Sequence, residues 1–291
     1  MTFRTRFAPS PTGPLHLGHA YSACLAYDMA RAAGGTFLLR IEDIDQSRAR
    51  SKWESQIHDD LAWLGVDFPP LVLKQSERLP PYRAALSKLD DMGLTYPCFC
   101  SRRDIQQAIS APQEGIEPTM GPDGHIYPGT CRELPKIAHQ DHAPALRLNM
   151  AKATEYLTDI GAQWPLSFRE TGNDTPQQIF LSKQDAIQCL GDIVLARQNM
   201  GTSYHLSVVL DDAEQDITHV IRGADLFEAT KIHLVLQKLL GLTTPIYHHH
   251  KLIRDEAGKR LAKRDDARAI SLYRDGGYTP TDLRRMLGLW A

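Results

Sequence analysis

The chain has 291 residues, of which 42% are hydrophobic and 23% are charged, and its formal net charge is −2. This length allows about two domains with sizeable cores, and the charge excludes a basic field over the whole molecule, although a local basic face would suffice for RNA. No run approaches the roughly 18 apolar residues of a membrane span, and the N-terminus lacks a signal-peptide pattern, so we expect a cytoplasmic protein without a membrane partner.

The first 41 residues predict a strand, a loop, a helix and a second strand. Residues 4–8 have the pattern of a short strand, and residues 9–14 hold Pro and Gly at a density that stops regular structure. Apolar residues then recur at helical spacing over residues 17–33, and a Gly-Gly pair ends this helix. Residues 36–41 predict a buried strand. Such a βαβ unit is expected to be parallel and right-handed.

The remaining elements are predicted from apolar spacing and turn residues. They are helices at 47–64 and 76–92, a strand at 94–100, a loop-rich segment at 101–140, strands at 143–149, 204–211 and 217–222, and helices at 225–240 and 279–290, the last with Thr279 as N-cap. Together they predict an α/β protein whose parallel sheet is split by an insertion at about residues 96–190.

Residues 6–19, RFAPSPTGPLHLGH, combine a Gly- and Pro-rich loop with two histidines. A Gly-rich loop between a strand and a helix presents backbone N–H groups and a positive helix end, which together bind phosphate. Gly13 and Gly18 allow close approach, and His16 and His19 share one side of the turn, where they can donate hydrogen bonds to phosphoryl oxygens. The simpler interpretation is that both histidines only complete the start of a helix.

The segment PSPTGPLHLGH resembles the HIGH signature of the class I aminoacyl-tRNA synthetases, and RFAPSPTG resembles the first strand of their glutamate branch. An H-x-G-H alone is also found in other nucleotidylyl transferases. The resemblance continues, in order, through residues 40–45 (RIEDID), 75–102, 204–226 and 255–265 (DEAGKRLAKRD), the last of which is similar to the KMSKS loop. It therefore covers nearly the whole chain.

The resemblance implies an α/β fold in which a Rossmann-like parallel-sheet catalytic domain carries an inserted, zinc-containing subdomain similar to an acceptor-binding domain. The implied segments are the first half of the catalytic domain (1–95), the insert (96–190), the second half (191–245), and the KMSKS loop with a helical tail (246–291). The implied reaction is carboxylate attack on ATP, with Mg²⁺, to give glutamyl-adenylate and pyrophosphate. This reaction needs positioning and charge stabilisation rather than a protein nucleophile.

For ATP, the resemblance implies contacts from the HIGH-like and KMSKS-like motifs. His16, His19 and Lys263 are the implied catalytic residues, and Gly18 and Arg260 join them in binding ATP. Arg260 keeps the positive charge of the first KMSKS position, whereas Ala262 replaces the usual Ser. The alternative for the second motif is a solvated basic loop.

For glutamate, the resemblance implies Arg6 on the side-chain carboxylate and Glu42 on the α-ammonium group, with Ser10, Tyr204 and Arg222 completing the pocket. Arginine suits a dicarboxylate substrate because its planar guanidinium makes bidentate contacts. Arg6 and Glu42 could instead pair with each other. Two further features are a departure at position 208, where Val replaces the family's usual Asn, and four aspartates to which we assign no role: Asp43, Asp45, Asp211 and Asp212.

Three of the five cysteines have a spacing that is typical of metal ligands. Cys98 and Cys100, two residues apart at the end of a strand, and Cys131 on a returning segment would supply three ligands to one structural Zn²⁺. The resemblance favours Tyr127 over His125 as the fourth ligand, because the family pattern ends in Y-x-x-x-C. The alternative is three unbonded cysteines.

The other two cysteines and a histidine run are expected to have structural roles. The odd total argues against a disulfide framework, and we expect Cys24 and Cys189 to be small core residues. We expect no metal at residues 248–250 (HHH), because adjacent strand residues point to opposite faces.

Only a short tail follows the KMSKS-like loop, without room for a helical anticodon-binding domain. Together with Val208, this indicates a short branch of the family, whose members activate glutamate without tRNA and esterify it to queuosine in the anticodon loop of tRNA(Asp). The expected partners are glutamate, ATP and queuosine-containing tRNA(Asp), bound by a monomer. Two alternatives remain: a truncated synthetase that charges a tRNA 3′ end, and a non-catalytic paralogue that binds an amino acid or RNA.

Overall fold

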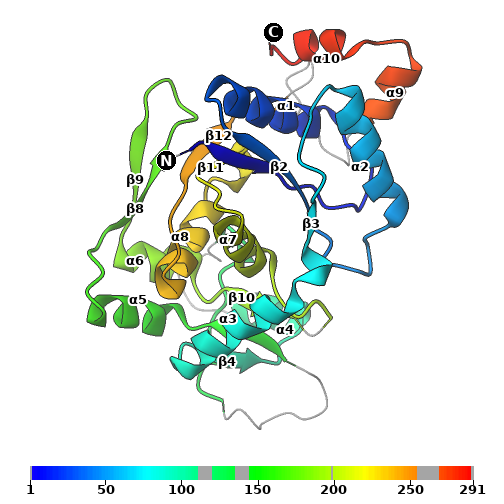
Figure 1. Ribbon diagram of the computed structural model, residues 1–291. Coiled ribbons are helices and arrows are strands. Elements are labelled where there is room, and N and C mark those ends of the chain that lie inside the picture. Colours follow the sequence, from blue (N-terminus) through cyan, green and yellow to red (C-terminus); the bar gives the residue numbers. More distant parts are fainter. Residues whose placement is uncertain (1, 111–119, 135–143, 198, 254–268, 290–291) are drawn as a thin grey trace.

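The computed structural model describes residues 2–110, 120–134, 144–197, 199–253 and 269–289 (Figure 1). Figure 1 shows a group of neighbouring strands covered on one side by α1 and on the other by α7 and α8, with a second group of strands around β4 and β10 at the far end. Within the described ranges, every helix is too short or too polar to cross a bilayer.

The predicted βαβ unit at the N-terminus is confirmed. Strands β1 (Arg4–Phe7) and β2 (Thr36–Ile41) pair in parallel, and helix α1 (Leu17–Ala32) connects them. The chain leaves α1 through Gly34, whose φ of +60° is easy only for glycine. The helix buries the stripe expected from its spacing: Leu17, Ala20, Ala23, Cys24, Ala26, Tyr27 and Ala30.

Three further strands extend this unit into a larger sheet. Strand β3 (Leu73–Lys74) pairs in parallel with β2, and β11 (His219–Gly223) pairs in parallel with β12 (Ile246–His250). The two groups meet where the backbone N–H of Thr218 donates to the Arg4 carbonyl oxygen over 2.9 Å. The hydrogen-bonded groups are thus β3–β2–β1 and β11–β12, the second of which continues through β8 (Leu166–Glu170), and they lie edge to edge at β1 and β11. The N-terminal strand is therefore flanked by β2 and β11.

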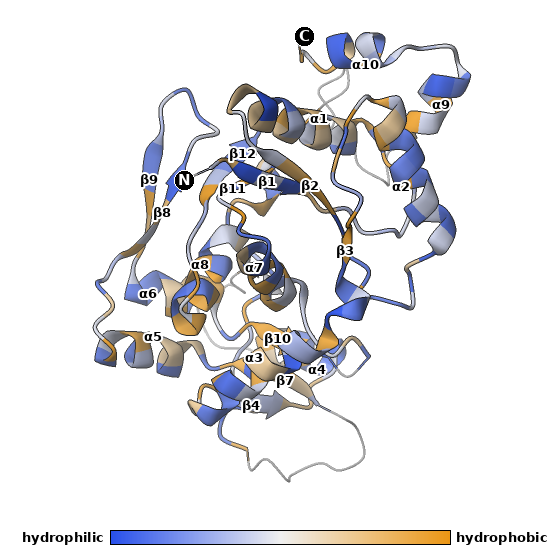
Figure 2. Cartoon of the chain, viewed as in Figure 1, coloured by the Kyte–Doolittle hydropathy of each residue, from blue (hydrophilic) through white to orange (hydrophobic). Residues whose placement is uncertain are grey.

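Two hydrophobic cores lie on opposite faces of this sheet. Helices α1, α2 (Ser51–Trp63) and α10 (Pro280–Met286) share one core, whereas α3 (Leu79–Asp91), α7 (Tyr204–Glu214) and α8 (Ala229–Leu240) share the other. Strand β2 contributes to both because its side chains alternate. Figure 2 shows β2 as hydrophobic and β1 as hydrophilic, and the polar residue Arg6 of β1 is nevertheless buried.

The insert has its own antiparallel sheet, in the order β10–β7–β4. Its elements are β4 (Thr95–Cys98), α4 (Arg102–Ser110), the small hairpin β5 (Met120–Gly121) and β6 (Gly124–His125), β7 (Ala145–Leu148), α5 (Met150–Asp159) and β10 (Val194–Ala196). The remaining elements are the hairpin β8 (Leu166–Glu170) and β9 (Gln177–Leu181), α6 (Lys183–Asp185), a π-helical turn (Ala186–Leu190), α9 (Ile270–Asp275), and 3₁₀ turns at Gln75–Glu77 and Ala224–Leu226.

The four-segment division of the chain stays a prediction. Strand β8, from the predicted insert 96–190, pairs with β12 of the main sheet, and β10, from the predicted second half, pairs with β7 of the insert. The chain therefore crosses between the two regions more often than four consecutive segments require.

Three sequence-based expectations about local structure are wrong. Residues 204–211 form the first part of helix α7, not a strand, and Ser203 caps this helix by accepting from the Leu206 N–H over 3.3 Å. Seven residues of α7 are buried, so the helix lacks a polar face and its adjacent valines resemble a strand. Helix α4 lies in the segment predicted as loop-rich, and Cys189 is exposed, whereas Cys24 is buried as expected.

Candidate active site

A cavity of about 520 Å³ lies beyond the carboxyl ends of the parallel strands, where open α/β sheets bind ligands. Glu42 follows β2, Gln75 follows β3, and Arg222 and His250 lie near the ends of β11 and β12. All the described residues that were predicted to bind glutamate or ATP line this cavity: Arg6, Ser10, His16, Gly18, His19, Glu42, Tyr204 and Arg222. The fold therefore brings them together, and their individual roles stay predictions.

His16 and His19 form a reciprocal cap at the start of α1. His16 Nδ1 accepts from the Gly18 N–H over 3.1 Å, and His19 Nδ1 accepts from the His16 N–H over 3.2 Å. A Cβ at position 18 would lie 3.1 Å from His16 Cε1, so glycine leaves room for the ring to fold back. Both histidines therefore do complete the start of a helix, as the simpler interpretation holds.

The cap also fixes which imidazole nitrogen carries the proton. A ring nitrogen that accepts a hydrogen bond is unprotonated, so each neutral ring carries its proton on Nε2. The two ring centroids are 3.9 Å apart, and both residues line the cavity. One nitrogen of each ring thus serves the helix, and the other can donate to a ligand oxygen.

A buried ion-pair network underlies the cavity. Asp212 on α7 accepts from Arg6 at Nε over 2.9 Å and at Nη2 over 3.2 Å, and from Arg40 at Nη1 over 2.8 Å. Arg40 also lies 3.4 Å from Glu42. The alternative pairing of Arg6 with Glu42 is therefore wrong, because Arg6 pairs with Asp212 and Glu42 pairs with Arg40.

The charges in this network set the protonation of its carboxyl groups. Burial raises the pKa of Asp212, but Arg6 and Arg40 outweigh burial, so the pKa lies below its ordinary value. For Glu42 burial dominates, and the pKa is raised although Arg40 and Arg6 oppose the rise. Asp212 is therefore the firm anion of the network, whereas burial disfavours the charged form of Glu42.

Sequence reasoning missed Arg40 and gave no role to the aspartates. Arg40 is fully buried, and the signal was a charged residue within the apolar strand TFLLRI. Asp211 accepts from Tyr82 Oη and from Gln75 Nε2, each over 2.8 Å. The other two brace loops: Asp43 accepts from the Ser76 hydroxyl and backbone N–H, and Asp45 accepts from Ser47 and Arg48.

Arg222 is a buried cation with neutral partners. It is 6% exposed and lines the cavity. Its Nε donates to His249 over 3.1 Å, its Nη1 lies 3.3 Å from His233 Nδ1, and its Nη2 donates to Thr230 over 2.6 Å and to the Leu226 carbonyl oxygen over 3.3 Å. No ion pair within the described part of the chain includes Arg222. Since buried charges are normally paired, this arrangement calls for an anionic ligand.

The KMSKS-like residues Arg260, Ala262 and Lys263 lie outside the described residues. The described residues on either side of that segment reach the cavity: Ile253 lines it, and Ala269 forms a bridge with His16. Val208, where the sequence departs from the family pattern, is 1% exposed and packs in the hydrophobic core beside α8 rather than lining the cavity.

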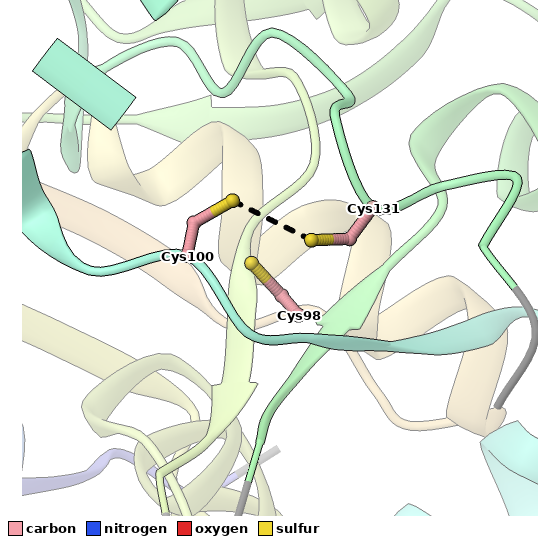
Figure 3. Close-up of side chains that lie close together, drawn as sticks. All are labelled: Cys98, Cys100 and Cys131. Atoms are coloured by element: carbon pink, nitrogen blue, oxygen red, sulfur yellow. Dashed lines mark hydrogen bonds between the residues drawn. The ribbon is translucent and has the colours of Figure 1, made fainter. Parts of the chain in front are cut away.

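Cys98, Cys100 and Cys131 come together in the insert, as predicted (Figure 3). Their three Sγ atoms lie within 4.8 Å of one another, and Cys100 Sγ is 3.4 Å from Cys131 Sγ. Cys98 ends strand β4, so sheet pairing with β7 fixes its position. Three converging thiols match the donor set of a metal site, and sulfur ligands favour Zn²⁺ among common metals.

The sequence predicted Tyr127 as the fourth ligand, and the phenol oxygen of Tyr127 lies beside the three cysteines. Its Oη lies 3.4 Å from Cys100 Sγ and accepts from the Cys131 backbone N–H over 2.9 Å. The guanidinium of Arg147 lies 3.9 Å from the Tyr127 ring centroid and holds the ring in place. His125 is exposed on β6 and does not belong to the cluster of close donors found in the described residues.

The three consecutive histidines of β12 each have a different partner. His248 Nδ1 lies 3.1 Å from Thr171 Oγ1, His249 Nδ1 lies 2.5 Å from Glu170 Oε2, and His250 Nε2 lies 2.7 Å from Ser22 Oγ on α1. His248 and His249 thus contact neighbouring residues at the end of β8, and His250 contacts a helix.

The cavity, its capped histidines and its paired arginines define a nucleotide-binding α/β enzyme site, and comparison with known proteins gives its family. The family model described as tRNA synthetases class I (E and Q), catalytic domain, matches residues 2–291. The chain belongs to this family, as the resemblance implied. It is 60% identical over 287 residues to the glutamyl-Q tRNA(Asp) synthetase of Rhodobacter capsulatus, covering 98% of this chain and 99% of that protein.

A second relative and a solved structure agree with this family. The glutamyl-Q tRNA(Asp) synthetase of Deinococcus radiodurans is 40% identical, over 96% of this chain and 86% of that protein. A crystal structure of a glutamate tRNA ligase from Elizabethkingia meningosepticum, in complex with its amino acid, superimposes with a TM-score of 0.77 at 25% identity. This chain is covered over 99% of its length and that ligase over 61% of its length. The predicted class I synthetase fold is therefore confirmed.

Proposed function

We propose that this chain activates glutamate with ATP and transfers it to queuosine in the anticodon loop of tRNA(Asp). The observation that carries the first step is Arg222, a buried guanidinium that lines the cavity and has only neutral partners. A substrate carboxylate supplies the anion that such a site calls for. The relatives that are 60% and 40% identical bear the name glutamyl-Q tRNA(Asp) synthetase, which supports queuosine as the acceptor.

Glutamate is held by groups of both charges. Arg6 bonds to Asp212 through Nε and Nη2, which leaves its Nη1 for the side-chain carboxylate. Glu42 accepts the α-ammonium group, whose charge favours the ionised form of this buried carboxyl group. Ser10, Tyr204 and Arg222 complete the pocket. This assignment rests on the position of all five residues around one cavity.

Activation is in-line displacement at the α-phosphorus of ATP. An oxygen of the glutamate α-carboxylate attacks the phosphorus, the bond to the bridging oxygen breaks, and pyrophosphate leaves. His16 and His19 donate from Nε2 to the phosphoryl oxygens, and Gly18 allows the nucleotide to approach the start of α1. Arg260 and Lys263, for which the resemblance implies a role with ATP, add positive charge at the triphosphate, which would carry Mg²⁺. A queuosine hydroxyl then attacks the acyl carbon, and AMP leaves.

We infer that Cys98, Cys100 and Cys131 hold one structural Zn²⁺, with Tyr127 as the fourth ligand. The convergence of three thiols and the adjacent phenol supports this set. The ion would tie the end of β4 to the segment around Cys131 and take no part in the reaction.

We also propose that the enzyme acts as a cytoplasmic monomer. Its proposed tRNA substrate is a cytoplasmic molecule.

The test is transfer of labelled glutamate to tRNA(Asp) with and without queuosine, in the presence of ATP and Mg²⁺. Label that appears only on the queuosine-containing tRNA supports the proposal. Label that reaches tRNA(Glu), and is lost when the 3′ ribose is oxidised, indicates a synthetase that charges the 3′ end. Failure of glutamate-dependent ATP–pyrophosphate exchange, with glutamate binding retained, indicates a non-catalytic binding protein.

A further inference from the structure

Two chains of polar contacts converge on the guanidinium of Arg222, and every link in them is a hydrogen bond except the last one, from His205 to Asp123. We propose that these chains, which run through His249 to Glu170 and through His233 and His205 to Asp123, hold the Arg222 cation in the orientation that receives the substrate carboxylate. His249 and His233 are then positioning residues for glutamate. This inference rests on the proposed function, because it assigns Arg222 to the amino acid.

The first chain leaves from Arg222 Nε. Since arginine has no acceptor, Nε–H donates to His249 Nε2 over 3.1 Å, and that nitrogen is unprotonated. The proton of His249 therefore sits on Nδ1 and points to Glu170 Oε2, 2.5 Å away. Glu170 is 1% exposed and accepts two more hydrogen bonds, from the backbone N–H groups of His249 and Gly172. The chain ends on a firmly held carboxylate.

The second chain leaves from Arg222 Nη1. This group donates to His233 Nδ1 over 3.3 Å, so the His233 proton sits on Nε2 and points to His205 Nδ1, 3.1 Å away. His205 then carries its proton on Nε2, which lies 3.7 Å from Asp123 Oδ1. Asp123 lies between β5 and β6, so this chain reaches from the amino-acid pocket into the insert.

The two imidazoles that accept from Arg222 must be neutral, and the surroundings of His233 and His249 favour that state. Burial lowers the pKa of His233 well below its ordinary value, and Arg222 lowers it further. Burial also lowers the pKa of His249, which the neighbouring Glu170 only partly offsets. Both rings are more than nine-tenths buried. Two fixed acceptors thus hold the guanidinium, and neither of them is an anion that would neutralise its charge.

The tautomers make opposite predictions for two amide substitutions. An asparagine places its amide near the Nδ1 position of a histidine, and a glutamine places its amide near the Nε2 position. At position 249 the acceptor for Arg222 is Nε2, so His249→Gln keeps it and His249→Asn loses it. At position 233 the acceptor is Nδ1, so His233→Asn keeps it and His233→Gln loses it.

The experiment measures KM for glutamate, KM for ATP and kcat by ATP–pyrophosphate exchange in all four variants. We expect KM for glutamate to rise about tenfold or more in His249→Asn and His233→Gln, the usual effect of losing one hydrogen bond to a charged group. His249→Gln and His233→Asn should stay within about threefold of the wild type, and KM for ATP should not change in any variant. Thermal melting of each variant reports its folding.

Asn and Gln are expected to have opposite effects at positions 249 and 233, and this crossed pattern distinguishes a positioning role from a structural one. If both substitutions at one position raise KM for glutamate equally, or if KM for ATP rises in parallel, the inference is overturned. If the wild-type protein shows no glutamate-dependent exchange, the proposed function fails, and the inference fails with it. Exchange in the wild type without the crossed pattern overturns the positioning chains alone.

Discussion

At the residue scale, the imidazoles of His16 and His19 combine a structural role with a proposed role in the reaction. Nδ1 accepts a backbone N–H and caps α1, and both residues line the cavity, where we propose that Nε2 donates to phosphoryl oxygens. A substitution to alanine removes both functions at once. Asparagine separates them, because it is among the best N-cap residues and carries an acceptor near the Nδ1 position.

We predict that His16→Asn folds with wild-type stability but forms adenylate at least about tenfold more slowly, since the donor to the phosphoryl group is lost. His16→Ala should lose the same activity and also about 0.5–2 kcal/mol of stability. Single-turnover adenylate formation and denaturant unfolding measure the two effects. Wild-type rates in His16→Asn would remove this residue from the reaction.

Arg222 gives a second prediction at this scale. Lysine keeps the charge but lacks the planar fork, in which three separate nitrogens of Arg222 donate to His249, His233 and Thr230. We predict that Arg222→Lys lowers kcat/KM for glutamate at least about a hundredfold and leaves KM for ATP unchanged. The matched control is Arg4→Lys, on the same sheet but outside the cavity, where Arg4 makes a surface ion pair with Asp216. Equal losses in both variants would contradict the assignment.

At the scale of elements, the thiol cluster joins the end of β4 to the segment around Cys131. We predict that Cys131→Ser lowers the zinc content of the purified protein from about one equivalent and increases proteolytic cleavage of the insert, because a three-sulfur site loses a ligand. Cys189→Ser is the matched control, since Cys189 is exposed and outside the cluster. Metal analysis of both proteins checks the prediction, and unchanged zinc in Cys131→Ser would refute it.

Between helices α2 and α9 lies a carboxyl group, that of Asp60, whose charged form is disfavoured by burial. Asp60 of α2 is fully buried, and its nearest cation is Arg274 of α9, 3.6 Å away. Burial raises the pKa of Asp60 to about 6, from an ordinary value of about 4. The folded state therefore holds this proton more tightly than the unfolded state, and the free energy of unfolding falls as the pH rises between these two values.

We predict that Asp60→Asn melts at a higher temperature than the wild type at about pH 7.5 and loses this advantage at about pH 4.5, where Asp60 is largely protonated. Melting curves of both proteins at the two pH values test the sign. Asp91→Asn is the control, because Asp91 is an exposed residue of α3 and is not among the charges that shift the pKa of Asp60. An advantage that grows toward acid would show that the Arg274 contact outweighs the burial of the charge.

At the scale of the whole molecule, one cavity draws on residues from β1 to β12 and lies between the two cores. We predict that a non-hydrolysable glutamyl-adenylate analogue slows amide hydrogen exchange at the start of α1 and around Arg222, and leaves α5 unchanged. Binding stabilises only the folded state, and protection is greatest where ligand and backbone meet. Exchange measured by mass spectrometry, with AMP alone as the control, tests the prediction. Protection confined to one core would contradict a shared site.

The sequence predicts features that depend on neighbouring residues better than features that depend on residues far apart in the chain. The βαβ unit and the capped histidines lie within 41 consecutive residues, where local spacing and turn chemistry are sufficient. The partner of Arg6 is Asp212, 206 positions away, and no local pattern links the two. Helix α7 was predicted as a strand because it is buried on most sides, which erases the periodicity that identifies a helix.

The seam between β1 and β11 has a consequence for how the chain is made. Arg4 and Thr218 are 214 positions apart, yet they are neighbours in the middle of the sheet. A nascent chain that leaves the ribosome therefore carries β1 with an open hydrogen-bonding edge until more than two hundred further residues have been translated. Such long-range pairing slows folding, and an exposed edge invites pairing with other chains. Strand β1 can pair with β2 early, but its other edge stays open until β11 has been made.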